Sequence, residues 1–380
     1  MKDSFDFHSF CPFRVCPLGA HIDHQGGLVT GFALDKGINF DFSATEDGSI
    51  EVRSLNFEGI AKGSVFDSFE KKVSWQDFLF GAVETLKLEY SVKYGIAGVL
   101  DGVFLGGGLS SSAAVILTYL RAFCKVNGII LTPPDLVRLA VYEERNFIGV
   151  NVGTLDQSCE VYCRKDNLLF LDTLDASSRL LPLNPAMKPF EIAVVVSGVE
   201  RKLASSAYNT RVDECKAASY FLKDISGMEY GRFSETKLRD VPFEIFEQYK
   251  DRLPVHWQKR AEHFYGEMNR VKKGVEFWKN GDMEMFGRQI FESGDSSINM
   301  YEAGSEELKF LHSLMKQTDG IYGSRFSGAG FNGCAMALAD PAKKEEIEFN
   351  LTEKYLKKFP HLKNRFSVQF CKTSDGVGIL

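Results

Sequence analysis

The sequence contains no cysteine pair of the form Cys-x-x-Cys, although eight cysteines are spread over its 380 residues. This spacing argues against the usual zinc sites and predicts reduced, mostly buried thiols. No apolar run reaches the roughly 18 residues of a membrane-spanning helix. The first residues include acids and no apolar stretch, so a signal peptide is not expected. We therefore expect a cytoplasmic protein.

Positive charge is not in excess, because 45 lysine and arginine residues stand against 51 aspartate and glutamate residues, a formal net charge of −6. Neither nucleic acid nor an anionic membrane is therefore expected as a partner. Internal repeats, charge blocks and low-complexity linkers are also missing, so any boundary between domains should be compact. The length exceeds the usual size of one domain and predicts two lobes. The pattern gives no indication of the oligomeric state.

The apolar pattern predicts strands mainly in the first half of the chain and helices mainly in the second. Ile38, Phe40 and Phe42 alternate with polar residues within a predicted meander of strands over 28–54. Helices are predicted over 75–88, 110–124, 133–145, 203–222 and 341–358, a mostly helical pattern from 240 to 320, and short strands over 192–196, 334–338 and 366–370. This order, with strands returning near the end, predicts an α+β fold of two lobes.

The most informative segment reads Gly106-Gly107-Gly108-Leu109-Ser110-Ser111-Ser112-Ala113. Glycines let the backbone approach an anion closely, and the free amides at the start of a following helix would point at that anion. No Lys-Ser/Thr pair follows the glycines, so the segment is not a P-loop, and Ser111 stands where a dinucleotide-binding fingerprint has its third glycine. The segment therefore fits either another kind of phosphate cradle or a tight turn whose serines cap the helix.

A second segment, from Pro12 to Gly27, places His21, Asp23 and His24 among glycines. A carboxylate can accept hydrogen bonds from two neighbouring hydroxyl groups with a histidine beside it, so the segment suits a polyol site. The same residues could be a fragment of a metallohydrolase centre, but none of the remaining histidines is spaced as a further ligand pair. An ordinary loop with a satisfied histidine and a turn aspartate is the other alternative.

Two further segments carry candidate residues. Asp156 follows Gly153 between apolar neighbours, which is not typical of an exposed helix face, whereas the acids Glu143 and Glu144 could simply be solvated. A glycine-rich turn over 327–333 leads into a predicted strand. An ordinary tight hairpin would explain that turn equally well.

Taken together and in this order, the segments resemble the GHMP small-molecule kinases and, within them, the galactokinase group. Arg14 to Gly27 follow the sugar signature of that group with substitutions, and Gly106 to Ala113 match its phosphate loop residue for residue. Further motifs of the group are matched by Gly153 to Gln157, by Leu203 to Arg211 and by Arg325 to Cys334. The resemblance therefore extends over most of the chain.

The resemblance implies a role for each matched residue. Asp156 matches the catalytic aspartate of the family, and Arg14 matches its partner arginine. Glu144 and a serine of the loop, with Ser112 favoured over Ser111, match the Mg²⁺ ligands. The implied sugar-binding residues are Ala20, His21, Asp23, Gly153 and Tyr208, and the implied ATP-binding residues are Gly106, Gly107, Gly108, Leu109, Ser110, Ser111, Ser112 and Trp75.

The resemblance also implies a fold, cofactors and a reaction. The fold has two α+β lobes, expected over residues 1–185 and 186–380, with the active site between them. ATP and Mg²⁺ are the implied cofactors, and a sugar is the implied substrate. Asp156 would accept the proton of the anomeric hydroxyl or orient that hydroxyl for phosphoryl transfer.

One departure from the sugar signature bears on the substrate. The glutamate of the family, which accepts a hydrogen bond from the C6 hydroxyl, is replaced by Ala20, and its tyrosine is replaced by His24. A glutamate about 4 Å from a C6 carboxylate would repel it by about 4 kcal/mol at an effective dielectric constant near 20. Residues 16–27 also resemble the galacturonokinase branch. We therefore expect D-galacturonate, with D-galactose as the alternative, and His24, Lys202 or Arg211 as the cation that pairs with the carboxylate.

Other functions remain as alternatives. A non-catalytic sugar sensor on the galactokinase scaffold would bind ATP and sugar and regulate a partner. The presence of Arg14, Glu144, Asp156 and all three loop serines favours an enzyme instead. A mevalonate or homoserine kinase of the same superfamily is disfavoured by the sugar signature.

Overall fold

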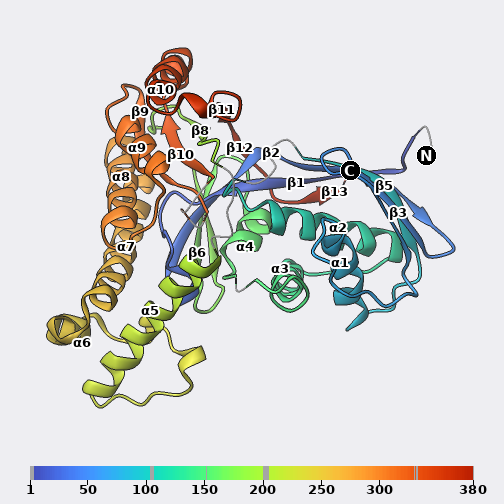
Figure 1. Ribbon diagram of the computed structural model, residues 1–380, viewed down its shortest axis with the longest axis horizontal. Coiled ribbons are helices and arrows are strands. Elements are labelled where there is room, and N and C mark those ends of the chain that lie inside the picture. Colours follow the sequence, from blue (N-terminus) through green and yellow to red (C-terminus); the bar gives the residue numbers. More distant parts are fainter. Residues whose placement is uncertain are drawn as a thin grey trace. The chain divides into compact units, whose positions relative to one another are not determined.

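The computed structural model describes residues 4–102, 107–150, 152–199, 205–328, 330 and 333–379, and Figure 1 shows its ribbon. Of the motif residues and candidates selected from the sequence, those outside the described part are Gly106, Lys202, Leu203, Ala204, Ala329, Phe331 and Asn332. The strands are β1 (Phe7–Val15), β2 (Leu28–Thr45), β3 (Ser49–Ser54), β4 (Ile60–Ser64), β5 (Gly95–Gly102), β6 (Asn167–Asp172), β7 (Ser178–Pro182), β8 (Glu191–Val196), β9 (Ile321–Phe326), β10 (Cys334–Ala339), β11 (Ser367–Cys371), β12 (Thr373–Ser374) and β13 (Gly378–Ile379).

Helices and strands are mixed along the chain, which confirms the predicted α+β class. The α-helices are α1 (Asp77–Lys87), α2 (Ser111–Asn127), α3 (Pro133–Tyr142), α4 (Leu155–Tyr162), α5 (Ser205–Ile225), α6 (Phe243–Tyr249), α7 (Val255–Lys279), α8 (Met283–Asn299), α9 (Glu306–Met315) and α10 (Lys344–Lys358). No helix in the described ranges combines the length and apolar character that crossing a bilayer would take.

All five helices predicted with bounds differ from the observed ones at one or both ends, and two of these differences have a clear local cause or position. The helix predicted from residue 75 begins at Asp77, because the carboxylate of Asp77 accepts the amide N–H groups of Lys72 and Ser74, each at 3.0 Å, and closes a turn in front of it. The helix predicted to run through residue 145 leaves α geometry after Tyr142 and continues as the π-helical turn Glu143–Ile148. Such π turns occur often at functional sites.

The described residues form two compact units whose segments alternate along the chain. The first unit comprises Met1–Arg14, Ala33–Lys165 and Ser374–Leu380, and the second comprises Val15–Phe32 and Asp166–Thr373. The boundary predicted between residues 185 and 186 stays a prediction, because these units describe packing and not the extent of family domains.

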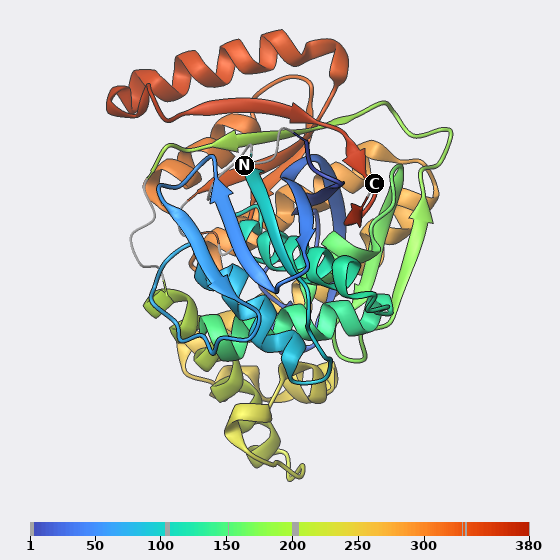
Figure 2. The same cartoon turned by 90° about the vertical axis from the view of Figure 1, so that its right-hand side faces the viewer.

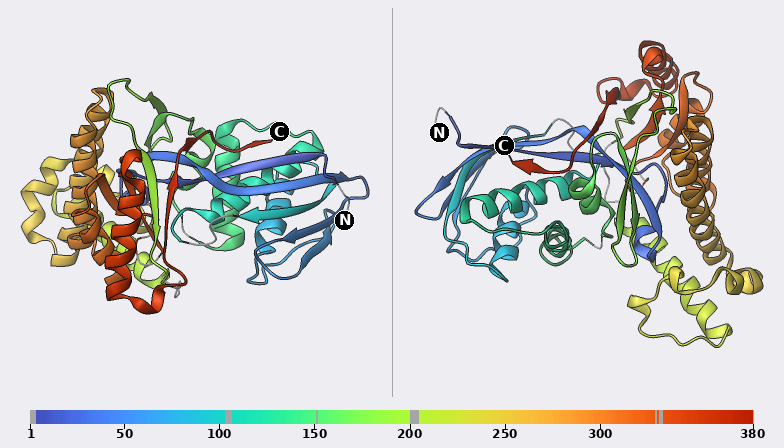
Figure 3. Two further views of the ribbon diagram at one scale, coloured as in Figure 1. Left: turned by 90° about the horizontal axis from the view of Figure 1, so that it is seen from above. Right: turned by 180° about the vertical axis from the view of Figure 1, so that it is seen from behind.

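The first unit is built on a sheet in which β2 runs antiparallel to β5, and β5 runs parallel to β3. The alternation read from the sequence is confirmed, since Ile38, Phe40 and Phe42 are all 0% exposed. The ring of Phe40 meets the ring of Tyr119 on α2 edge to face at 5.4 Å. Helices α1 and α2 therefore cover the apolar face of this sheet (Figure 3).

The second unit contains an antiparallel sheet with the strand order β11-β8-β10-β9. Every residue of β10 is 0% exposed, so this strand is covered on both faces. Helix α10 runs beside β11 (Figure 2), and α7 and α8 lie side by side, with α8 against β9 (Figure 1). In the same unit β6 pairs with β7 and with the start of β2, residues Leu28 to Gly31.

The contact between α8 and β9 leaves no room for side chains at two glycines. A Cβ on Gly287 would lie 2.1 Å from the carbonyl oxygen of Tyr322, and a Cβ on Gly323 would lie 2.3 Å from the carbonyl oxygen of Gly287. Because both neighbours are backbone atoms, they cannot rotate away. Glycine at these positions lets the helix lie directly on the strand.

We expect Gly287→Ala to lower the free energy of unfolding by about 2–3 kcal/mol, because the helix must move away from the strand to admit the methyl group. Urea unfolding followed by circular dichroism measures this change. Gly231→Ala is the matched control, since a Cβ there would meet no described atom within 4 Å, and its effect should stay within about 0.5 kcal/mol. Equal effects of the two substitutions would contradict the argument.

Candidate functional site

The glycine–serine turn, residues 107–112, precedes α2 and has a backbone that few residue types adopt. Gly108 and Ser110 are both left-handed, with φ of 91° and 68°, and α2 begins at the next residue, Ser111. A Cβ added at Gly107 would meet no atom of the described residues within 4 Å, so the turn is open there. An open turn with the free amides of a helix N-terminus is suited to bind an anion. The implied ATP-binding residues from Gly107 through Leu109 to Ser112 therefore share this one turn.

Arg14 links the glycine–serine turn to the implied catalytic acid. Its guanidinium donates to the Asp156 carboxylate from Nε at 2.8 Å and approaches it from Nη2 at 2.7 Å, while Nη1 donates to the carbonyl oxygen of Gly108 at 3.0 Å. Burial opposes the charge of Arg14, but the Asp156 carboxylate outweighs that effect and raises the arginine pKa. Asp156 lies in the first turn of α4 and keeps 29% of its side chain exposed. The acid is therefore held in place while its carboxylate stays partly open.

Glu144 is brought to the same turn by the π-helical segment. Its carboxylate accepts a hydrogen bond from the Ser112 hydroxyl at 2.7 Å and another from the Gln157 side-chain amide at 2.6 Å. Glu144 is 4% exposed, and burial raises its pKa to about 7 although both hydrogen bonds act in the opposite direction. The hydroxyl of Thr154 and the carbonyl oxygen of the Gln157 side chain are buried nearby without a hydrogen-bond partner in the described chain. These polar atoms are available to a ligand.

The residues expected to hold Mg²⁺ fit that ion by their donor chemistry. The Ser112 hydroxyl and the Glu144 carboxylate are hard oxygen donors that already lie within hydrogen-bond distance of each other. Mg²⁺ usually binds one or two carboxylates and completes its shell with phosphate oxygens and water. No group of three or more His, Cys, Asp or Glu side chains in the described ranges is arranged to hold a metal by itself. The ion would therefore need the nucleotide for its remaining ligands.

The sequence left Glu143 and Glu144 as acids that could be solvated, which is wrong because both are buried, and Glu160 was missed. Glu143 and Glu160 are 0% exposed, and neither carboxyl group has a hydrogen-bond partner among the described residues. Burial raises the pKa of both groups well above the usual value, which favours the neutral form. Glu143 faces α1, since a Cβ added at Gly81 would lie 2.9 Å from its Oε1. Sequence alone offered no reason to place acids inside the core.

Trp75 lies in the turn before α1 and is partly buried. Its indole N–H donates to the carbonyl oxygen of Glu58 at 3.1 Å. Glu58 belongs to the segment Arg53–Gly59, which lines a cavity of about 320 Å³. The ring therefore supports the wall of this cavity, and its contact with adenine stays a prediction.

In the second unit, two of the implied sugar-binding residues gather with His24 around Tyr301. The ring of His21 stacks on the Tyr301 ring with centroids 4.4 Å apart and an interplanar angle of 3°, and Tyr208 meets His24 edge to face at 6.0 Å. His21 has a left-handed φ of 55°, and its buried Nε2 has no hydrogen-bond partner among the described residues. Asp23 begins a single 3-10 turn and is partly exposed. Tyr301 itself was missed, because nothing in its helical surroundings marks it.

The hydrogen bonds of His24 define its protonation. The amide of Leu238 donates to Oε1 of Gln25 at 3.0 Å, which leaves the Gln25 Nε2 group facing Nδ1 of His24 at 2.9 Å. Nδ1 is therefore the acceptor, and the Nε2–H group donates to the Tyr301 hydroxyl at 3.2 Å. Burial, and then the positive charge of Lys216, lower the His24 pKa to about 3. His24 is thus neutral and not a cation for a carboxylate ligand.

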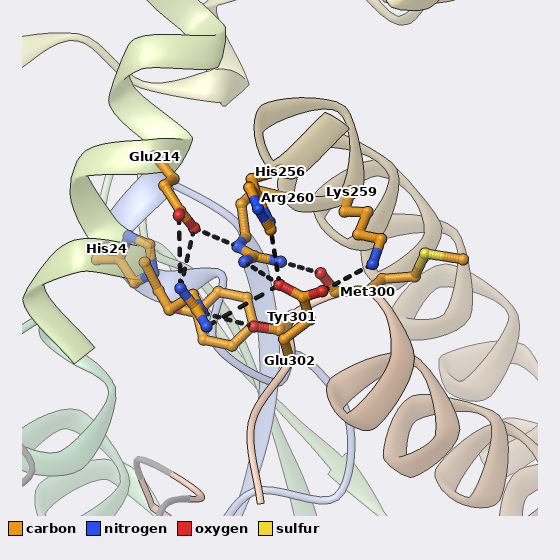
Figure 4. A network of polar contacts seen from close by, with 9 residues as sticks. His24, Glu214, His256, Lys259, Arg260, Met300, Tyr301 and Glu302 are labelled. Carbon is orange, nitrogen blue, oxygen red and sulfur yellow. Dashed lines mark hydrogen bonds and ion pairs between the residues drawn. The ribbon is translucent and has the colours of Figure 1, made fainter. Parts of the chain in front are cut away.

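Arg211 is also paired with other groups of the protein. It donates to the Tyr301 carbonyl oxygen at 3.0 Å and lies 3.3 Å from the Glu214 carboxylate. The fully buried Arg260 joins the same network by binding Glu214 at 2.6 Å and Glu302 at 2.7 Å (Figure 4). Acids thus surround both guanidinium groups. Of the three cations considered from the sequence, His24 is neutral, Arg211 is paired and Lys202 lies outside the described residues.

No side-chain contact among the described residues tests the sugar-binding role implied for Ala20 and Gly153. Ala20 is 1% exposed and precedes His21 in the second unit. Gly153 belongs to the first unit, in the segment that leads into α4 and Asp156. Their contact with sugar stays a prediction.

Comparison with known families agrees with the arrangement of motifs. Residues 77–164 match the family model described as the GHMP kinases N terminal domain, and residues 275–357 match the model described as GHMP kinases C terminal. The first match contains the glycine–serine turn, Glu144 and Asp156. The second contains the C-terminal end of α7, from Val275 to Lys279, and all of α8.

Individual relatives cover nearly the whole chain. A galacturonokinase of Arabidopsis thaliana is 35% identical over 97% of this chain and 92% of its own length. A galactokinase of Thermosipho africanus is 31% identical over 96% of this chain and 97% of its own length. Among solved structures, Lactococcus lactis galactokinase in complex with galactose has a TM-score of 0.89 at 24% identity, with 98% of this chain and 94% of that chain covered. The last comparison supports the fold.

The neutral state of His24 predicts a pH-dependent stability. Its folded pKa of about 3 lies below the unfolded value near 6.5, so the stabilisation is complete above about pH 6.5 and is lost as the pH falls towards 3. His24→Gln cannot take up the proton, so between pH 7 and pH 5 it should lose about 1–2 kcal/mol less than the wild type. Urea unfolding at both pH values measures the difference. The exposed His361→Gln variant should keep the wild-type dependence, and a His24→Gln variant that also kept it would refute the argument.

Proposed function

Since this chain belongs to the GHMP kinases and is a sugar kinase of the galactokinase group, a phosphotransferase that uses ATP, we propose that it phosphorylates the anomeric hydroxyl of D-galacturonate. The observation that supports this reaction is a chain of hydrogen bonds from Asp156 through Arg14 to the carbonyl oxygen of Gly108. It joins the implied catalytic acid to the turn that is suited to bind an anion. The substrate is argued separately, from Ala20.

Phosphoryl transfer needs alignment and charge stabilisation more than covalent chemistry. The amides of the glycine–serine turn would hold the terminal phosphates of ATP, with the helix dipole of α2 adding to the attraction. Ser112 and Glu144 would hold Mg²⁺, which when bound neutralises phosphate charge. Glu144, with a pKa of about 7, must give up its proton to act as that ligand.

Asp156 would receive the proton of the anomeric hydroxyl or orient that hydroxyl toward the phosphate. The two donors of Arg14 fix the carboxylate, so little rearrangement is needed when the sugar binds. In a loose transition state the proton leaves late, and a carboxylate is basic enough for that step. Arg14 would also offset charge that develops on the transferred group.

The proposed preference for galacturonate rests on the loss of a repelling acid. Ala20 occupies the position where the galactokinase signature has a glutamate, and a carboxylate there would repel a C6 carboxylate by about 4 kcal/mol at 4 Å. His24 is neutral, and Arg211 is paired with acids of the protein. No ion pair to the substrate is therefore part of the proposal. The relationship to a galacturonokinase supports the same preference, while the galactokinase relatives make D-galactose the competing substrate.

A cytoplasmic location is part of the proposal. All eight cysteines are buried and none forms a disulfide within the described chain. Such thiols are typical of a reducing compartment.

The substrate is tested by a panel of hexoses and uronic acids with ATP and Mg²⁺, with ADP release as the assay and NMR to locate the phosphate. We expect a higher kcat/KM for D-galacturonate than for D-galactose, with the phosphate on C1. The reverse order would make the protein a galactokinase. Binding of sugar and ATP without ADP release would identify a non-catalytic sensor.

We expect Asp156→Asn to lower kcat by at least ~100-fold, in keeping with the usual contribution of a general base. Asparagine keeps an oxygen that can accept from Arg14 but removes the charge that pairs with this buried arginine, so the melting temperature should fall and the assay is run well below it. The variant is assayed by ADP release alongside the wild type. Retention of most of the activity would refute the proposed role of this carboxylate.

We expect Ala20→Glu to shift the ratio of kcat/KM values toward galactose by at least about tenfold, because the new charge acts on the uronate and not on the neutral sugar. Ala20→Gln has the same size without the charge and serves as the control. It should leave the ratio within about threefold of the wild type. An equal shift in both variants would show that size, and not charge, sets the preference.

A further inference from the structure

The backbone before the sugar-site histidine is held by a helix that is distant in the sequence. Oε1 of Glu267, on α7, accepts the amide N–H groups of Gly19 at 2.9 Å and Ala20 at 3.1 Å. His263, one helical turn earlier on the same face of α7, lies with Nε2 2.7 Å from the carbonyl oxygen of Ala20. Ala20 and His263 are each 1% exposed and Glu267 is 0% exposed, so water does not compete for these bonds. We call His263 and Glu267 the α7 clamp.

The clamp acid is itself held on both oxygens. Oε1 of Glu267 accepts the Ser293 hydroxyl at 2.6 Å, and Oε2 accepts Nε of Arg270 at 2.6 Å. Burial opposes its charge, but Arg270 and then His263 outweigh that effect and lower the carboxyl pKa to about 2. Glu267 therefore stays ionised, and charged acceptors make the stronger hydrogen bonds to amides.

The clamp histidine has one usable tautomer. The carbonyl oxygen of Ala20 can only accept, so Nε2 of His263 must carry the proton. Nδ1 then accepts from the Ser296 hydroxyl at 2.8 Å. Burial lowers the His263 pKa to about 4, which keeps the ring neutral and this tautomer in place. The Ala20 carbonyl oxygen thus sets the tautomer of His263, and the Ser296 hydroxyl satisfies its remaining nitrogen.

The residue after the clamped pair is the one that needs support. His21 has a left-handed φ of 55°, a conformation that a residue with a Cβ holds only when its surroundings impose it. The clamp fixes both peptide groups before it, and stacking on Tyr301 fixes its ring. Without the clamp, the turn would be free to leave this conformation.

We propose that His263 and Glu267 are positioning residues for the sugar, which act by locking the peptide groups of Gly19 and Ala20 so that His21 and Asp23 are presented in the binding geometry. This inference rests on the proposed function, because it takes His21 and Asp23 as sugar-contacting residues. It goes beyond that function by assigning a role to two residues outside every motif of the sugar signature and the phosphate loop. Neither residue needs to touch the substrate.

The test compares variants at residue 263 by two measurements, the dissociation constant for galacturonate from calorimetry and the steady-state constants from ADP release. His263→Phe removes the donor and keeps the ring, and it should weaken sugar binding about tenfold, the equivalent of one buried hydrogen bond. kcat and the KM for ATP should stay within about twofold, because a lost ground-state contact acts on sugar affinity. His263→Gln keeps an N–H donor near the Nε2 position and should restore most of the affinity.

Three further variants complete the design. His312→Phe makes the same change at another buried histidine of this unit, which binds Asp295 at 3.0 Å and not the turn, so the sugar affinity should be unchanged. Ser296→Ala keeps His263 and removes the hydrogen bond that its Nδ1 accepts. It should weaken sugar binding about two- to fivefold. Glu267→Gln should weaken sugar binding in the same direction as His263→Phe, because its neutral amide can no longer pair with Arg270. If His263→Phe does not fold, the sugar affinities of Ser296→Ala and Glu267→Gln test the proposal.

The outcomes separate this inference from the proposed function. Unchanged sugar affinity in Ser296→Ala and His263→Phe, an equal loss in His312→Phe, or no rescue by His263→Gln would overturn the clamp while wild-type ADP release upholds the kinase. Sugar binding that follows the expected order without ADP release in the wild type would support the clamp and overturn the proposed reaction. No binding of galacturonate or galactose by the wild type would overturn both.

Discussion

The buried contact of Arg14 with Asp156 is the interaction on which the first unit depends. Arg14 is 4% exposed, so its charge must be matched inside the protein, and Asp156 supplies that match. The third nitrogen of the same guanidinium binds Gly108 and so places the glycine–serine turn relative to α4. One buried charge therefore fixes an anion-binding turn and a carboxylate together. Removing either partner would leave an unpaired charge, at a cost of about 3–5 kcal/mol.

Burial disfavours the charged form of three other acids of this unit, Glu143, Glu144 and Glu160. Burial raises the pKa of Glu143 and Glu160 well above the usual value, which favours their neutral form. Glu144 accepts hydrogen bonds from two donors, and burial raises its pKa to about 7. A cation would therefore find one ionisable acid beside Ser112 instead of a dense negative cluster. This sparse set suits an ion that brings phosphate oxygens with it.

In the second unit the candidate sugar-binding histidine and its neighbour His24 are neutral, and the charged side chains near them are paired with each other. His21 and His24 are neutral because they are buried, and they gather around Tyr301. The charges of Arg211 and Arg260 are paired with acids of the protein, and Figure 4 shows Arg260 joined to Glu214 and Glu302. Hydroxyl groups of a sugar suit such a surface, because neutral imidazoles can both donate and accept. Ala20 carries no charge at the position where the galactokinase signature has a glutamate.

The sequence by itself determined the α+β class, the alternation of buried residues over 38–42, the family and the residues of the glycine–serine turn, because these depend on local patterns. The predicted meander over 28–54 is wrong, since 28–45 form one strand and β5 lies between β2 and β3. The sequence also selected Arg14 and Asp156, although 142 positions separate them. Only the tertiary structure decided that Trp75 lies before α1 and that Tyr301 and the α7 clamp contact residues of the sugar signature. It also decided which ionisable groups are charged. A helical pattern shows which face of α7 is buried but not what it is buried against. Protonation depends on burial and on partners from distant segments, and these exist only once the chain is folded.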